Sequence, residues 1–154
     1  NGMTKGVLFL SAGNIHRAYG SKTTDVVRGA MRLLPWSGTM FLVGFLAITG
    51  SPPFGPFISE FSILNGAFDS GRFITAGLFL FLLLVVFIGM GATVLTVVQG
   101  KPLRDTHKTP YRETLLTAVP VAIFMGIVLF LGIYIPGPLD TLLNNAVHFL
   151  EGQP

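Results

Sequence analysis

Residues 46–60 read Leu-Ala-Ile-Thr-Gly-Ser-Pro-Pro-Phe-Gly-Pro-Phe-Ile-Ser-Glu and interrupt an apolar run at 36–68, in which Glu60 is the one charged residue. An unbroken helix over this run would be about 50 Å long at 1.5 Å per residue, whereas the hydrocarbon core of a bilayer is about 30 Å thick. Prolines remove backbone donors and clash with the preceding turn, and glycines permit unusual dihedral angles. The sequence therefore predicts a discontinuous helix with halves at 36–49 and about 56–68. The break between them is assigned to Gly50, Pro52, Pro53, Gly55 and Pro56.

Glu60 follows the break and has the apolar neighbours Phe57, Ile58 and Phe61. Backbone groups freed by a break must be buried in protein or face a polar cavity, and a carboxylate placed there needs a partner. One interpretation is a structural hydrogen bond between Glu60 and the loose backbone of the break. The other is a place on an ion or proton route, since acids in broken membrane helices often line such routes. We favour the second and predict that Glu60 lies on a proton path.

Long apolar blocks dominate the rest of the chain. Of its 154 residues 51% are hydrophobic and only 11% are charged, whereas soluble domains carry about 25% charged residues. The apolar residues form long blocks rather than amphipathic periods, which favours membrane spans over a soluble core. Together with the discontinuous helix, the blocks predict an all-α membrane protein with about four transmembrane helices. The three further blocks lie at 2–19, 73–98 and 114–135.

The C-terminal tail has a different pattern. Residues 139–150 place apolar side chains at helical spacing between polar ones, which predicts an amphipathic helix at the membrane interface. The apolar positions are Leu139, Leu142, Leu143, Ala146, Phe149 and Leu150.

Two connectors, at 20–34 and 99–113, carry most of the basic residues. Short loops rich in Lys and Arg stay on the cytoplasmic side of a membrane. Because two spans separate them, both connectors fall on one side and are predicted to be cytoplasmic, with the turn at 69–72 and the C-terminus outside. Since the basic residues lie mainly in these short segments between apolar blocks, the net charge of +3 does not indicate nucleic acid as a partner.

The chain contains no cysteine, which excludes disulfides, thiolate metal sites and cysteine-ligated iron–sulfur clusters within it. Neither a catalytic triad nor a metal-ligand spacing is present, so no cofactor, metal or catalytic site is expected here. The residues alone do not decide whether the chain is a subunit of an enzyme complex. Any electron transfer in such a complex would take place on another chain. The first apolar block is already under way near Asn1, so we expect residues 1–154 to be one transmembrane region of a larger protein.

Two further ionisable residues lie in the first apolar block. Lys5 is close to Gly2 and Gly6, which are small enough to let another helix approach, and a lysine inside a bilayer costs about 2.5–3.5 kcal/mol on insertion scales. It either exchanges protons within the membrane or snorkels, with its ammonium among the headgroups. His16 either relays protons, since histidine changes charge near neutral pH, or is an interfacial histidine next to Arg17.

Two motifs connect these residues to a known family. The first runs from Lys5 to His16 as Lys-Gly-Val-Leu-Phe-Leu-Ser-Ala-Gly-Asn-Ile-His. The second is Leu-Ala-Ile-Thr-Gly-Ser-Pro-Pro-Phe at 46–54, followed by Phe-Ile-Ser-Glu-Phe at 57–61. They resemble the proton-conducting antiporter-like subunits of respiratory complex I, energy-converting membrane hydrogenases and Mrp-type cation/proton antiporters. The Gly-Asn-Ile-His stretch and the Ser-Glu-Phe after Pro-Pro are most similar to the hydrogenase-4 or formate hydrogenlyase type.

The resemblance implies that the chain is the C-terminal, four-span part of a subunit with about fourteen spans in the cytoplasmic membrane of a bacterium or archaeon. It implies that Lys5 is the central lysine of a hydrophilic axis, that His16 relays protons from it, and that Glu60 is the terminal ionisable group on the broken helix. Many relatives have lysine at the last position, so the glutamate marks a subtype.

The function implied by this resemblance is proton translocation in a redox-driven complex, either NADH:quinone oxidoreductase-like or a membrane-bound hydrogenase. The chain would be a non-redox subunit whose partners are other membrane subunits, the lipid bilayer and protons. One alternative is an Mrp-type antiporter subunit, in which Glu60 also binds or gates a metal cation. The other is a structural membrane subunit whose ionisable groups serve helix packing only.

Overall fold

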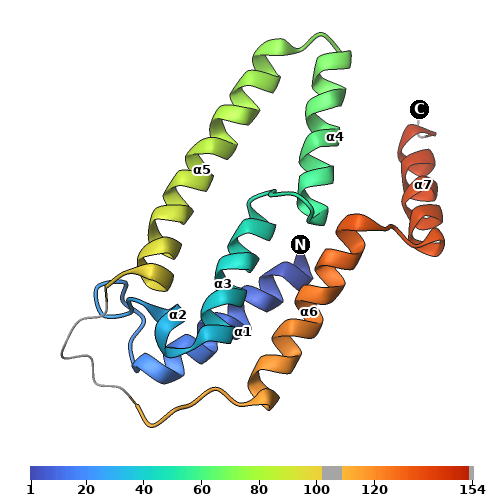
Figure 1. Cartoon of the computed structure of the whole chain (residues 1–154). Coiled ribbons are helices and arrows are strands. Elements are labelled where there is room, and N and C mark those ends of the chain that lie inside the picture. The colour runs from blue at the N-terminus through green and yellow to red at the C-terminus, as the bar shows by residue number, and fades with distance from the viewer. Residues whose placement is uncertain (102–108, 153–154) are drawn as a thin grey trace.

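The computed structural model describes residues 1–101 and 109–152, and every regular element within these ranges is a helix (Figure 1). The prediction of an all-α fold is thereby confirmed. The helices are α1 (Gly2–Tyr19), α2 (Ala30–Leu33), α3 (Pro35–Ile48), α4 (Gly55–Asp69), α5 (Phe73–Gln99), α6 (Leu115–Ile133) and α7 (Gly137–Glu151).

Two of the described helices are long and apolar enough to cross a membrane, α5 with 27 residues and α6 with 19. At 1.5 Å per residue they measure about 40 and 28 Å. The helices α3 and α4 have 14 and 15 residues, so neither crosses a hydrocarbon core of about 30 Å alone. Side chains such as Ile74 and Phe81 leave α5 with a broad exposed apolar surface, which suits lipid or another helix better than water.

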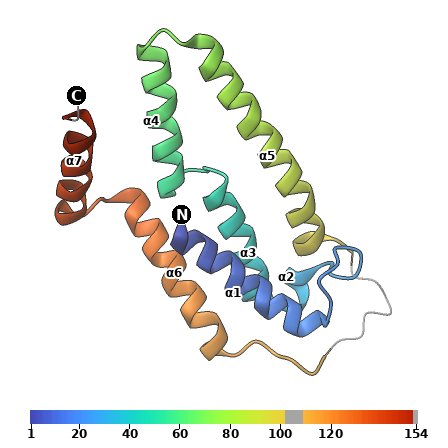
Figure 2. The same cartoon turned by 180° about the vertical axis from the view of Figure 1, so that it is seen from behind.

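The centre of the bundle consists of α1, α3 and α6. The helix α1 packs against both α3 and α6, and α5 packs against α3 (Figure 2). Small residues permit these contacts: a Cβ on Gly44 of α3 would lie 3.0 Å from Leu8 Cδ2 of α1, and one on Gly91 of α5 would lie 3.3 Å from Phe45 Cζ of α3. Glycines at such crossings allow membrane helices to approach closely.

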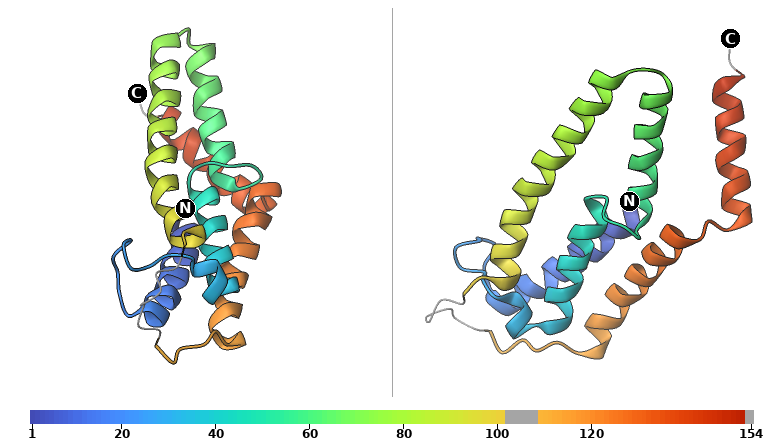
Figure 3. Two further views of the ribbon diagram at one scale, coloured as in Figure 1. Left: turned by 60° about the vertical axis from the view of Figure 1, so that its left-hand side comes forward. Right: turned by 45° about the horizontal axis from the view of Figure 1, so that its top comes forward.

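The two halves of the discontinuous helix follow one another with a break between them. The chain runs through α3 to the break, continues through α4, and returns along the bundle in α5 (Figure 3). The N-terminus, the break and the end of α6 lie at about one level of the bundle, and α4 projects beyond it (Figure 1). Since the halves have 14 and 15 residues, the break divides the discontinuous helix almost equally.

The connectors meet at the opposite end of the bundle. Only one short helix, α2, forms within 20–34, and the Tyr19 hydroxyl holds this segment by donating to Arg28 O at 2.8 Å. Of the predicted connector at 99–113, residues 102–108 lie outside the described part of the chain. Beyond them, the Thr109 hydroxyl donates to Arg17 O at 2.6 Å, so the second connector returns beside the end of α1.

The helix α7 covers the tail that the sequence predicts to be amphipathic. It follows α6 after a short extended segment and stands apart from the bundle in Figures 1 and 2. Its apolar side chains, including Leu142 and Leu150, are largely exposed. Its position at a membrane interface stays a prediction.

Candidate functional site

The helix α3 ends at Gly50, which is left-handed, with the longer of the two hydrogen bonds that define a Schellman motif. The Thr49 N–H donates to Phe45 O at 3.1 Å and the Ser51 N–H donates to Leu46 O at 2.9 Å, while Gly50 has φ 70°. The bond from Ser51 satisfies the Leu46 carbonyl in the last turn of α3, and the left-handed residue at such a helix end is usually glycine because a Cβ is disfavoured there. The end of α3 is therefore stabilised by local hydrogen bonds within residues 45–51 and needs no contact with another helix.

Two prolines lower the number of unpaired backbone donors in the break. Pro52 and Pro53 have no N–H, and the peptide bond between them is cis. The next amide, that of Phe54, donates to Ser51 O at 3.2 Å. Fewer groups at the break then need a partner, which matters where water does not supply one.

The helix α4 begins at Gly55, so the interruption covers 49–54. The sequence assigns Gly55 to the break, and Pro56 both to the break and to the start of the second half, whereas the structure has the two residues in the first turn of α4. Amides in a first turn have no partner within the helix, so a proline at this place costs no hydrogen bond.

A glycine of α6 supports the break from the side. A Cβ built on Gly132 would overlap Pro53 O and would lie 2.7 Å from Gly55 N. The backbone of the break therefore packs directly against α6, at a position where Gly132 has no side chain to separate the two backbone segments. Sequence reasoning did not identify this residue, because Gly132 is one of several glycines in apolar helices and lies far from the break in sequence.

Glu60 lies over the break. Its side chain is half-buried, and its carboxylate reaches back from α4 to the Cα of Gly50, where a Cβ would overlap Oε2 and lie 2.8 Å from Oε1. No hydrogen bond to this carboxylate exists among residues 1–101 and 109–152. The missing side chain at position 50 thus makes the room that the carboxylate occupies.

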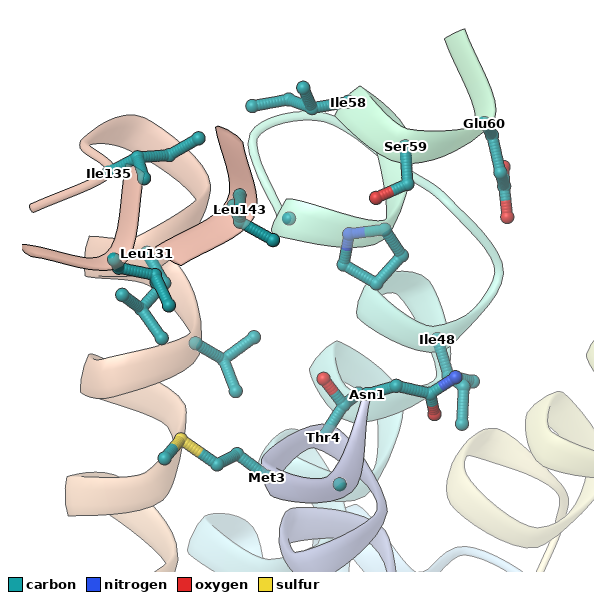
Figure 4. Close-up of a pocket in the computed structure, with 15 residues that line it drawn as sticks. Asn1, Met3, Thr4, Ile48, Ile58, Ser59, Glu60, Leu131, Ile135 and Leu143 are labelled. Atoms are coloured by element: carbon teal, nitrogen blue, oxygen red, sulfur yellow. The ribbon is translucent and has the colours of Figure 1, made fainter. Parts of the chain in front are cut away.

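A cavity of about 640 Å³ lies beside this carboxylate (Figure 4). Its polar side chains come from Ser59 and Glu60 of α4 and from Asn1 and Thr4 at the start of α1. Its remaining wall is mostly apolar and includes residues of all the helices α1, α3, α4, α6 and α7. The Thr4 hydroxyl is buried and has no hydrogen-bond partner among the described residues. A cavity with several polar groups and an apolar wall can hold water next to Glu60.

Lys5 lies in the first turns of α1, at the level of the break, but it is not among the residues that line the cavity. It is exposed, whereas its neighbour Thr4 is 1% exposed and lines the cavity. Within the described part of the chain, the structure therefore brings the backbone of Lys5 near the break without joining its ammonium to the Glu60 carboxylate.

His16 lies at the other end of α1. It is eleven positions from Lys5, or about three turns, so both exposed side chains lie on the same face of the helix and about 16 Å apart along its axis. His16 and Glu60 line two different cavities. Of the three predicted proton-path residues, Lys5 and His16 thus form a stripe on α1, and Glu60 stands separately at the break.

A cluster of polar side chains joins α1, the start of α3 and the segment just before α6. Asn14, which is 7% exposed, donates to Ser37 Oγ at 3.1 Å and accepts from the Tyr111 hydroxyl at 3.1 Å. The Glu113 carboxylate accepts the Trp36 and Ser37 amides at 3.1 and 2.6 Å, which caps the first turn of α3. Sequence reasoning missed this cluster; the available signal was one asparagine within an apolar block, and its partners lie 23 or more positions away.

The chain is similar in sequence to a known family of membrane proteins. Residues 1–99 match the family model described as "NADH:quinone oxidoreductase/Mrp antiporter, TM". The chain is 28% identical over 149 residues to a Na(+)/H(+) antiporter subunit of Bacillus subtilis (strain 168), which covers 92% of this chain and 30% of the relative. It is 31% identical over 137 residues to a hydrogenase-4 component F homolog of Methylacidiphilum infernorum, covering 87% of this chain and 27% of the relative.

An archaeal relative is similar to the chain over a comparable length. The chain is 26% identical over 157 residues to a F(420)H(2) dehydrogenase subunit of Methanosarcina mazei, which covers 95% of this chain and 29% of the relative. The chain thus spans less than a third of the length of these three relatives. Because the family model covers well over half of the chain, the chain belongs to the NADH:quinone oxidoreductase/Mrp antiporter transmembrane family.

Proposed function

We propose that this chain is part of a proton-translocating membrane subunit of a redox-driven complex, either NADH:quinone oxidoreductase-like or a membrane-bound hydrogenase. The observation that carries the proposal is the half-buried Glu60 carboxylate at a break in an apolar helix, beside a cavity with further polar groups. Ionisable groups in such positions are costly and usually serve ion or proton transfer. A relative named as a hydrogenase-4 component and another named as a F(420)H(2) dehydrogenase subunit support this choice.

Protons would pass between Lys5, His16 and Glu60 through water. Since the stripe on α1 and the break are separate, water in the cavity at Ser59 and Thr4 would deliver protons to Glu60. Charge changes at Lys5 and Glu60 would be coupled electrostatically to redox steps on partner subunits, because charges interact more strongly where water is scarce. This coupling gives the chain a role in energy conversion without a cofactor of its own.

The membrane arrangement follows from the same elements. The spans would be α1, the discontinuous helix α3–α4, α5 and α6, with α7 at the interface and the connectors 20–34 and 99–113 in the cytoplasm. The nearly equal halves of the discontinuous helix would put the break, and Glu60, near the middle of the bilayer. Residues 1–154 would then be the C-terminal part of a larger subunit of a bacterial or archaeal cytoplasmic membrane.

A cation/proton antiporter subunit is the second candidate. It is favoured by relatives named as Na(+)/H(+) antiporter subunits, one of them at 28% identity. In that case the Glu60 carboxylate would bind or gate a metal cation as well as a proton, since carboxylate oxygens are suitable ligands for hard cations.

Transport by the whole complex in sealed vesicles tests the proposal. Lys5→Ala should lower proton translocation while the complex still assembles, and translocation by the parent should not depend on sodium. Sodium-dependent transport would favour the antiporter function instead. Unchanged translocation in both Lys5→Ala and Glu60→Gln would assign these residues to helix packing and would refute the proposed path.

A further inference from the structure

A second cavity, of about 580 Å³, opens at the end of the bundle where the connectors meet. It lies between α1, the 20–29 loop, α3 and α5, and its volume is typical of sites for small organic molecules, which measure about 300–1,000 Å³. No part of the proposed proton path except His16 touches it. It therefore calls for an explanation separate from that of the cavity at Glu60.

The lining of this cavity changes from polar to apolar along α1. His16 and Lys22 stand at its connector end, whereas Phe9, together with Phe41 and Val97 from α3 and α5, forms an apolar wall. Phe9 is seven positions before His16, which corresponds to about 10 Å along the helix. A ligand that fits this cavity has a polar or charged end and an apolar body of at least that length.

The polar end of the cavity has the composition of a headgroup region. Trp36, at the start of α3, is 59% exposed, and tryptophan is enriched at the level of membrane headgroups. Basic side chains gather at the same end, and the single ion pair within the described residues there, between Arg28 and Asp25, neutralises only one of them. The basic residues near this end are Arg17, Lys22, Arg28 and Arg32.

We propose that the cavity holds an acyl chain of an anionic phospholipid, with the phosphate beside Lys22 and the chain against Phe9, Phe41 and Val97. Basic pockets between membrane helices bind anionic lipid headgroups, and each nearby Lys or Arg strengthens the attraction. The positive charge at the rim favours an anionic lipid. Because the polar residues lie at the connector end of the cavity and Phe9 lies further along α1, the headgroup would face the connectors. This inference depends on the proposed membrane setting but not on the proposed proton path.

Two variants separate the headgroup from the acyl chain. Lys22→Gln removes the positive charge at the rim, and Thr93→Phe places a ring in the cavity from the exposed face of α5. Arg72→Gln is the matched control, because Arg72 precedes α5 at the far end of the bundle. Glu60→Gln is included because it should impair proton transfer and leave the lipid in place.

The measurement is native mass spectrometry of the full-length complex, titrated with phosphatidylglycerol or with phosphatidylcholine. We expect the parent to retain phosphatidylglycerol preferentially, Lys22→Gln to weaken that binding about fivefold, and Thr93→Phe to weaken the binding of both lipids. Arg72→Gln and Glu60→Gln should bind like the parent. Equal retention of both lipids by the parent, or unchanged binding in both Lys22→Gln and Thr93→Phe, would overturn the proposal and indicate that a helix of a longer protein or partner fills the cavity.

Discussion

At the scale of single residues, the contact between Glu60 and Gly50 is the feature on which the site depends. Gly50 has two tasks there: its φ of 70° ends α3, and its lack of a side chain makes room for the Glu60 carboxylate. The first task concerns the backbone, and the second concerns the position of a group proposed to carry protons. They can be separated by comparing two glycines.

Replacing Gly50 by Ala should disturb Glu60 and lower proton translocation. The control is Gly71→Ala, because Gly71 has φ 68° at the end of α4 and a Cβ there would meet nothing within 4 Å. Both variants should lose about 1–2 kcal/mol of stability from the left-handed backbone, measured as similar shifts in thermal unfolding. Only Gly50→Ala should reduce transport in vesicles; an equal reduction in Gly71→Ala would show that backbone strain alone is responsible.

The sequence allows Glu60 and the break to be predicted, because both depend on local patterns. One carboxylate in an apolar run, directly after three prolines, stands out without knowledge of any contact. The sequence predicts roles for both Gly50 and Glu60 but not the contact between them. A break of several residues allows α4 to continue in many directions, so the contact does not follow from the local pattern. The direction is set by contacts with other helices.

At the scale of elements, the break is held between its own capping motif and the neighbouring helix α6. The close approach of Gly132 to Pro53 and Gly55 fixes where α4 starts relative to α6. Such a contact joins segments that are almost 80 positions apart, and nothing in the local pattern of either one indicates it. Helix existence was therefore predictable here, whereas helix placement was not.

Gly132→Val should push α6 away from the break. Overpacking of this kind costs about 1–3 kcal/mol, so we expect lower thermal stability of the purified complex and loss of transport. Gly126→Val on the same helix is the control, since a Cβ at Gly126 would meet nothing within 4 Å. If both valine variants behaved alike, the contact between α6 and the break would have no special importance.

Glu113 should stabilise the start of α3 through its two hydrogen bonds to the Trp36 and Ser37 amides. Glu113→Ala would leave both amides without this acceptor, and we expect a loss of about 2 kcal/mol. Glu113→Gln keeps one acceptor oxygen and should lose about half as much. Thermal unfolding of the three proteins checks the order; equal stability of Glu113→Ala and the parent would contradict a capping role.

Across the whole bundle, the proposed membrane arrangement puts both connectors in the cytoplasm. Exposed single-cysteine labels at Thr23 and Ser70 report on the two ends of the bundle. In a whole protein without other accessible cysteines, a membrane-impermeant maleimide should label Thr23→Cys only from the cytoplasmic side and Ser70→Cys only from the outside. Labelling of both from one side would contradict the proposed spans, because the discontinuous helix α3–α4 separates these positions.

The proposed function depends above all on proton transfer by Glu60 at the break of the discontinuous helix. Its most direct test is the number of protons translocated per turnover by the assembled complex in sealed vesicles, for the parent, Glu60→Gln and the control Asp69→Asn. Asp69 is an exposed carboxylate at the end of the same helix, away from the break. We expect translocation to fall to the level of passive leak in Glu60→Gln alone, with assembly intact. Translocation by Glu60→Gln equal to that of the parent would show that this carboxylate is structural.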